Sequence, residues 1–324
     1  MILDSFLKRA GVCALIIVWG FGTPVLAQTA NGGRSAFDFL KISPVSRAVG
    51  VAEAYTALGD DVGAICYNPA GLASVLTNEL NVTYLSLYQG MDYEFLAFAC
   101  PLGASFQSLD GTVAISANLL QPGNMQRTND QGVTVGTFSS GDSIFTLAYA
   151  RQFSPSFHVG IAAKLIQQQI DTVQTSLFDM DAGVVILPPF QGMRVGISMK
   201  NLGSQESGFD LPFVLNTGIS YRRYELFSEQ DDGVITAEAN FPIRPIEDNV
   251  GVKVGIEYNY KWVGNRLTVR GGYEFLDKSL NNAGLVLGAG YGIDLSGAVL
   301  FLDYAYAPED IFGEAHRISL TTKF

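Results

Sequence analysis

The chain has little of the side-chain chemistry on which enzymes and metal proteins depend. It contains only two histidines, His158 and His316, among 324 residues. Its three cysteines, Cys13, Cys66 and Cys100, stand at spacings that match no metal-binding motif. The sequence therefore has too few histidines to suggest a histidine-based metal site or a Ser-His-acid triad. We expect no catalytic residue, no metal and no cofactor.

Positive charge is also scarce. The sequence holds 20 Lys and Arg against 31 Asp and Glu, which gives a formal net charge of -11. Because a surface that binds phosphates is normally basic, nucleic acid is not an expected partner.

Long apolar runs are missing after the first residues. Lys8 and Arg9 precede an apolar run over 10–21, and small residues follow over 24–27, which is the order of a secretory signal peptide. We place cleavage after Ala27. A single spanning helix is the alternative, but the run is shorter than the roughly 20 residues that a bilayer requires. An exported chain permits a disulfide between the two remaining cysteines, with two small buried apolar residues as the other possibility.

What the sequence has in quantity is glycine and aromatic residues, with 35 Gly, 14 Tyr and 21 Phe. Aromatics gather at the two interfaces of a transmembrane barrel, and glycines allow its strands to curve. A closed barrel can span lipid because it leaves no backbone edge unpaired. If the protein lies in a membrane, it does so as strands.

From residue 79 onward the sequence divides into about fourteen strand-like segments of eight to twelve residues. The expected cores are 79–88, 92–101, 111–120, 143–152, 157–168, 177–187, 192–201, 212–222, 233–241, 250–261, 265–275, 284–293, 297–306 and 315–324. Strands of about ten residues suit a tilted bilayer crossing, whereas soluble strands usually hold five or six. A soluble β-sandwich shares the alternating pattern, so the length of the strands is what favours an all-β transmembrane barrel.

The last strand shows the alternation well. Ile318, Leu320 and Phe324 lie on one face, and the opposite face from residue 317 to 323 is polar. A terminal aromatic on such a strand is where outer-membrane barrels carry the signal for their assembly machinery, so Phe324 is the expected assembly signal.

On the strand at 192–201, Lys200 belongs to the polar face. A luminal charged face is expected from Lys253, Glu257, Arg266, Arg270, Glu274 and Asp303.

An even number of strands puts both ends of the barrel on one side, the periplasm. The connections at 121–142, 202–211, 242–249, 276–283 and 307–314 then face outward, and 153–156, 188–191 and 262–264 are short inner turns. The acidic turn near 223–232 is an exception to this asymmetry.

Residues 44–75 do not have a strand pattern. Apolar residues recur at near-helical spacing over 44–58, and Asn68 stands as an N-cap before Pro69. Two apolar helical pieces before a barrel are best placed inside its lumen, either as a hatch that gates the pore or as a plug that never moves. The expected hatch residues are Arg47, Asp60, Asp61, Asn68, Pro69 and Ala70. The expected domains are a signal peptide at 1–27, an extension and hatch at 28–78, and a barrel at 79–324.

The sequence resembles the PorV/PorQ family of outer-membrane proteins, which belongs with the FadL-type barrels. The resemblance is carried by residues 39–42, 46–50, 53–54, 57–58, 60–61 and 67–73, returns at 184–187, 201–203, 255–258 and 270–273, and is strongest at 302–308 and 316–320. It covers nearly the whole mature chain and implies fourteen strands with an N-terminal luminal hatch.

The resemblance implies first a function in protein secretion, by docking of cargo at the outer membrane, and it leaves two alternatives. Some PorV-like members are similar to components of type IX secretion, which bind secreted cargo proteins at the outer membrane. FadL-type relatives admit long-chain fatty acids and other hydrophobic compounds. A purely structural barrel is a third possibility. In all three cases the expected partners are outer-membrane lipid and the barrel assembly machinery, with cargo proteins or hydrophobic small molecules as ligands.

Overall fold

The protein is described from a computed structural model. The structure describes residues 37–87, 90–103, 110–121, 123, 125–203, 211–244, 250–275, 284–309 and 313–324. The predicted signal peptide at 1–27 lies outside these residues.

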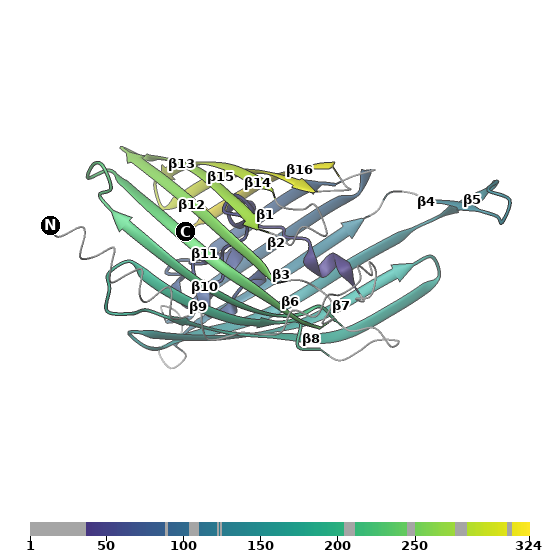
Figure 1. Cartoon of the computed structure of the whole chain (residues 1–324), viewed down its shortest axis with the longest axis horizontal. Helices are drawn as coiled ribbons and strands as arrows, with labels where there is room; N and C mark the ends of the chain where they lie inside the picture. Colours follow the sequence, from purple (N-terminus) through teal and green to yellow (C-terminus); the bar gives the residue numbers. More distant parts are fainter. Residues whose placement is uncertain are drawn as a thin grey trace. The chain divides into compact units, whose positions relative to one another are not determined.

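Fourteen of the strands in the described residues form one closed antiparallel barrel (Figure 1). The barrel strands are β1 (Glu79–Ser86), β2 (Asp92–Pro101), β3 (Thr112–Gln121), β6 (Ser140–Ser154), β7 (Phe157–Ile170), β8 (Val173–Ile186), β9 (Met193–Lys200), β10 (Phe213–Tyr224), β11 (Asp231–Arg244), β12 (Gly251–Trp262), β13 (Asn265–Phe275), β14 (Leu285–Leu295), β15 (Ala298–Glu309) and β16 (Gly313–Lys323). The first and last strands close the barrel, with Val82 opposite Leu320. The predicted fold class and all fourteen strand cores are confirmed.

The alternation along the strands separates an apolar exterior from a polar interior. On β16, Ile318 and Leu320 are exposed while Arg317 and Ser319 are buried. β12 repeats the pattern, with residues of the Val252 face exposed and those of the Lys253 face buried. The exposed band of aliphatic and aromatic side chains is the surface that suits lipid. Among the described residues, no helix has the length and apolar character needed to cross a membrane.

The two ends of the barrel differ. The end where β1 begins and β16 finishes, here the terminal end, has tight turns such as Val263–Gly264 between β12 and β13. The acidic turn expected at 223–232 shortens to 225–230, because Asp231 and Asp232 belong to β11 and are buried. The opposite end, here the loop end, carries the long connection from β3 to β6.

That connection contains a structure that the sequence did not predict. Strands β4 (Met125–Thr128) and β5 (Thr134–Phe138) pair with each other in a separate two-stranded sheet. Figure 1 shows this ribbon standing clear of the barrel wall.

Residues 37–75 are folded as short helical turns. They are η1 (Asp38–Lys41), α2 (Ser46–Val49), η2 (Val62–Cys66) and η3 (Pro69–Ser74). The expected helix over 44–58 is thus a single turn. It stops because Ala52 and Glu53 have left-handed backbone angles, with φ of 53° and 60°. The cap at Asn68 with Pro69 in the first turn is confirmed.

Candidate functional site

Residues 44–75, called the hatch from here on, fill the middle of the barrel. Their apolar side chains pack against small inward residues of the wall, including Ala97, Ala114, Ala148 and Ala162. Glycines give the hatch backbone further room. A Cβ added at Gly160 would lie 2.4 Å from the backbone nitrogen of Ala70. The wall is therefore shaped to the hatch, with small residues where the two backbones meet.

Asn68 joins two parts of the hatch to the wall. Its Oδ1 accepts a hydrogen bond from the backbone N–H of Ala70, at 3.1 Å. Its Nδ2 donates to the carbonyl of Thr56 at 2.9 Å and to the carbonyl of Val184, on β8, at 3.1 Å. Because the side chain is 1% exposed, these bonds replace water and fix the turn in place.

The side of the hatch nearer the terminal end is held by ion pairs around Arg47. Its Nη1 lies 2.6 Å from Asp60 Oδ1 and 2.8 Å from Asp61 Oδ2, and its Nε lies 2.9 Å from Glu257 Oε2. Arg270 Nε donates to the same Glu257 oxygen at 2.8 Å. These five residues are called the Arg47 cluster, and they join hatch residues to β12 and β13.

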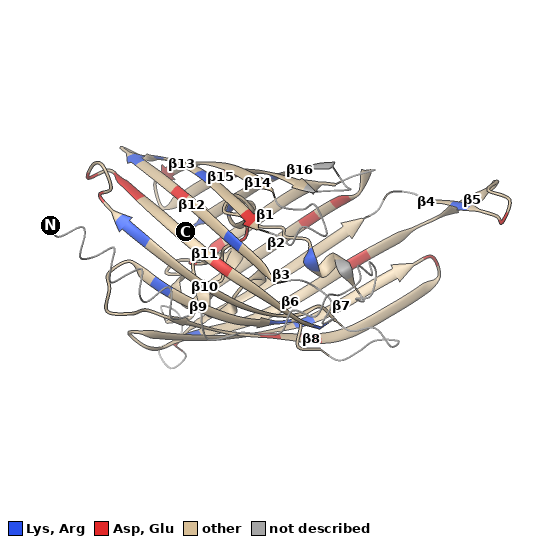
Figure 2. Ribbon diagram, in the orientation of Figure 1, with Lys and Arg blue, Asp and Glu red and all other residues tan. Residues whose placement is uncertain are grey.

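The cluster extends around the wall. Arg270 Nη1 lies 2.5 Å from Asp303 Oδ1 on β15, and Arg222 on β10 lies 3.4 Å from Asp60 Oδ2. Figure 2 shows blue and red residues interspersed along these strands. A carboxylate surrounded by cations keeps its charge. Burial acts to raise the pKa of Asp60, but the guanidinium groups of Arg47 and Arg222 outweigh burial and hold it well below its usual range.

The predicted luminal face is found inside the barrel. Lys253, Glu257, Arg270 and Asp303 are all less than 9% exposed. Lys253 pairs with Glu53 of the hatch at 2.8 Å and with Glu274 at 3.6 Å, while Arg266 donates to Asn259 at 3.2 Å. The structure thus brings Arg47, Asp60 and Asp61 together with part of this face. Pro69 and Ala70 lie apart from the ions, against β7.

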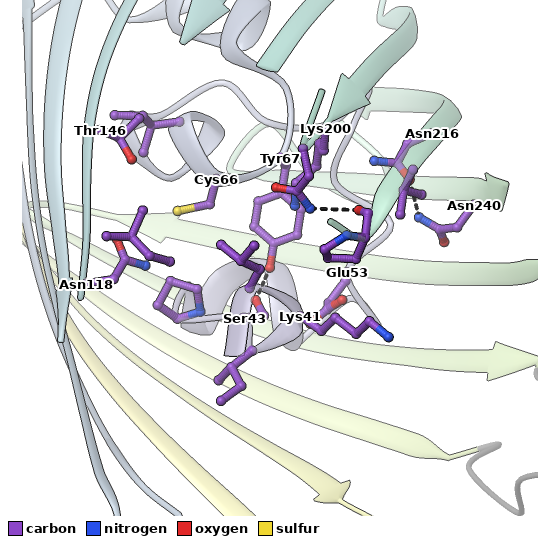
Figure 3. A pocket seen from close by; sticks show the side chains of 18 of the residues that line it. Lys41, Ser43, Glu53, Cys66, Tyr67, Asn118, Thr146, Lys200, Asn216 and Asn240 are labelled. Carbon is purple, nitrogen blue, oxygen red and sulfur yellow. Dashed lines mark hydrogen bonds between the residues drawn. The ribbon is translucent and has the colours of Figure 1, made fainter. Parts of the chain in front are cut away.

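On the other side of the hatch, toward the loop end, a cavity of about 140 Å³ separates hatch and wall. We call it the hatch cavity. Figure 3 shows Tyr67 at its centre, between Lys200 and Ser43. Polar wall residues from β3, β6, β9, β10 and β11 line it, together with Leu40, Ile42 and other apolar residues. By contrast, the small cavity of about 20 Å³ beside Arg47 has room for little more than a water molecule.

One wall of the hatch cavity carries a second buried ion group. Lys164 Nζ lies 2.5 Å from Asp181 Oδ1 and 3.1 Å from Asp179 Oδ2, and it also donates to Asn201 Oδ1 at 2.8 Å. The backbone N–H of Gly203 donates to Asp179 at 2.7 Å. This group ties the end of β9 to β8.

Cys66 faces the hatch cavity and is not bonded to Cys100, as both are free thiols. Burial raises the pKa of the Cys66 thiol to about 12. Of the two possibilities that the sequence left open, the structure has the unpaired cysteines, and both are half-buried. His158 is buried on the inward face, and His316 is on the outward face, where its Nδ1 is hydrogen-bonded with the hydroxyl of Tyr304.

Sequence reasoning named Lys200 as inward-facing but did not single it out, and it missed Tyr67 and the Lys164 group. The alternation of side chains along each strand predicts which of them face inward. This alternation does not predict which strand and hatch residues meet across the lumen.

No protein-family model matches the sequence, and no curated protein matches it. Among solved structures, the toluene transporter TbuX of Ralstonia pickettii is similar over 89% of this chain and 100% of its own, with a TM-score of 0.60 and 13% identity. The chain has a FadL-type barrel fold.

Two further structures agree. The Pseudomonas putida toluene transporter TodX is similar over 85% of this chain and 98% of its own, at 11% identity and a TM-score of 0.53. A Pseudomonas aeruginosa FadL homologue is similar over 87% and 98%, at 11% identity and a TM-score of 0.51. The expected FadL-type barrel is confirmed at the level of fold, and membership of the PorV/PorQ family stays a prediction.

Proposed function

We propose that the chain is an outer-membrane channel that admits small hydrophobic molecules, with the hatch as its movable barrier. The observation that carries this proposal is the hatch cavity, which lies between the plug and the wall where a solute would have to pass. The solved structures of like fold include toluene transporters, which favours transport over the secretion function that the sequence resemblance put first.

The barrel wall beside the hatch cavity supports the same proposal. β8 and β9 pair through five residue pairs, from Ala182 opposite Met199 to Ile186 opposite Val195. The part of β8 from Val173 to Asp181 has no ladder partner on that side among the described residues. Leu202 N–H bonds the Met180 carbonyl there instead. A wall held by few ladder bonds opens more readily than one with a full ladder.

The outer surface and the chain ends fit a membrane location. In this proposal residues 1–27 direct export, and outer-membrane lipid covers the exposed apolar band. Phe324 is 51% exposed on that band, and its backbone bonds Asn78 at 2.9 and 3.0 Å. We propose that the barrel assembly machinery reads this residue.

A disulfide between hatch and wall tests whether the barrier moves. A Cβ built on Gly218 of β10 lies 3.4 Å from Ala57 Cβ, which is close to the about 3.5 to 4.5 Å of natural disulfides. We expect the double variant Ala57→Cys and Gly218→Cys, made with both native cysteines changed to Ala, to stop toluene uptake into proteoliposomes when oxidised. Reduction should restore the uptake.

The matched controls are the two single-cysteine variants under the same oxidant, which cannot form the bond. Uptake that continues through the oxidised double variant would show that the hatch is a fixed plug. Absence of toluene uptake in the reduced and wild-type proteins alike would count against the channel itself.

The β4–β5 ribbon favours a second candidate, docking of secreted cargo proteins. Val133 and Val135 on this ribbon are 56% and 57% exposed, and within the described part of the chain its two strands pair only with each other. Unpaired strand edges can add a strand from a partner. Removing residues 125–138 should abolish capture of secreted proteins by the purified barrel while leaving toluene uptake intact, if docking is the function.

A further inference from the structure

Lys200 lies in the wall of the hatch cavity, and no carboxylate of the described residues pairs with it. Within the same residues it takes part in no hydrogen bond, and its close partner is the ring of Tyr67, with Nζ 5.4 Å from the ring centroid. Figure 3 shows the two side chains next to each other, with Tyr67 pointing across the cavity. A cation over an aromatic ring is attracted to it but is not neutralised.

The other interior lysines around the cavity are different. Lys164 is bonded by Asp179 and Asp181, and Lys253 is bonded by Glu53 and approached by Glu274. A buried ammonium without a counter-ion is costly, so proteins usually supply one. Among the described residues, none takes the place of a counter-ion beside Lys200, which lines the cavity and is half-buried.

The two carboxylates in the cavity lining do not fill this place. Glu53 is bonded by Lys253 at 2.8 Å. Glu238 accepts hydrogen bonds from the Thr56 backbone at 2.8 Å and from Asn240 Nδ2 at 3.1 Å. Both are thus held by other donors.

The cavity that Lys200 lines is small, and part of its lining is apolar. Leu40, Ile42 and Ile144 line the cavity and belong to a larger apolar cluster that includes Phe37, Phe39 and Leu120. The volume of about 140 Å³ is close to the roughly 150 Å³ of an apolar cavity that binds benzene. A single ring fits this space, and a long acyl chain does not.

We propose that the hatch cavity binds a small organic carboxylate with an apolar body of about one ring, its carboxylate on Lys200 and its body against Leu40, Ile42 and Ile144. This inference rests on the proposed channel function and names its substrate class. The carboxylate is the preferred ligand, and neutral rings such as toluene, which the apolar lining also accepts, bind more weakly.

Equilibrium binding to the purified barrel in detergent tests the inference. We expect sodium benzoate to bind at least about tenfold more tightly than benzamide or toluene, because hydrogen bonds to charged groups are worth more than neutral ones. Lys200→Met should raise the Kd for benzoate by about tenfold or more, whereas Lys200→Arg should keep most of the affinity. The control Lys261→Met removes a lysine that pairs with Asp232 outside the cavity, and its benzoate affinity should be unchanged.

Heat-modifiable gel mobility establishes that each variant is a folded barrel before it is titrated. Equal binding of benzoate and benzamide, or benzoate binding unchanged in Lys200→Met, would overturn the inference. If laurate binds as tightly as benzoate and loses this affinity in Lys200→Met, the inferred limit of about one ring on the apolar body of the ligand is wrong. Because binding requires no passage across a membrane, benzoate binding by a protein that fails the uptake test would leave this inference standing and reject only the channel.

Discussion

The two sides of the hatch are built differently. Toward the terminal end, every charged atom of Arg47 has a carboxylate within 3.2 Å, and the space left is about 20 Å³. Toward the loop end, the space is about 140 Å³ and Lys200 has no carboxylate partner among the described residues. Fully paired buried charge resists separation, whereas an open cavity with a spare cation is ready for a ligand. The difference indicates that one side seals the barrel and the other receives a solute.

Cys66 gives the most sensitive check that the cavity side is shielded from bulk water. Burial raises the pKa of this thiol from 9.0 to about 12, so the thiol stays neutral at pH 8. Only the thiolate reacts with iodoacetamide, and a rise of three pKa units lowers its fraction by about a thousandfold. We expect Cys66, in a Cys100→Ala background, to be alkylated about a thousandfold more slowly in the folded barrel than in urea at pH 8. The folded rate should keep rising with pH up to about 12. Equal rates would show that the cavity is filled by bulk water, and would remove the contrast between the two sides.

Arg47 tests the sealing side. Arg47→Met leaves Asp60, Asp61 and Glu257 with fewer cations, and breaking a partly buried ion cluster costs about 3 kcal/mol or more. We expect this variant to show a lower unfolding temperature and a leak conductance in planar bilayers that the wild-type barrel lacks. The control is Arg127→Met, which breaks an exposed pair between Arg127 of β4 and Asp171 of the turn between β7 and β8, and should cost about 1 kcal/mol or less. A closed, stable Arg47→Met barrel would mean that packing alone holds the hatch.

The strands could be predicted from the sequence because their pattern is local. The core predicted at 265–275 coincides with β13, and the core at 250–261 differs from β12 by one residue at each end. Alternation of two residues, repeated over ten, is enough to place a strand and its inward face. The same parity placed Lys253 and Glu257 in the lumen.

The hatch backbone could not be predicted in the same way. Near-helical spacing at 44–58 indicated a helix, but Ala52 and Glu53 adopt left-handed angles. Both residues meet the wall far along the sequence, Ala52 at Gly272 and Glu53 at Lys253. The missing counter-ion beside Lys200 also depends on which acidic residues of distant segments approach this side chain. The alternation of inward and outward residues along a strand does not tell which distant residues meet.

The close fit of hatch and wall can be tested with two matched variants on one strand. Their effect on the free energy of unfolding is the smallest that we expect. Gly272 of β13 faces inward, where an added Cβ would lie 2.5 Å from the backbone nitrogen of Ala52. Its neighbour Gly271 faces outward, where the nearest atom, Cγ1 of Ile256, would be 3.9 Å away. Gly272→Ala should lower the free energy of unfolding by about 1 to 3 kcal/mol through overpacking, and Gly271→Ala should change it by less than about 0.5 kcal/mol. Urea unfolding followed by gel mobility measures both. If the two variants unfold alike, the hatch does not press on this wall, and a solute could pass on either side of it.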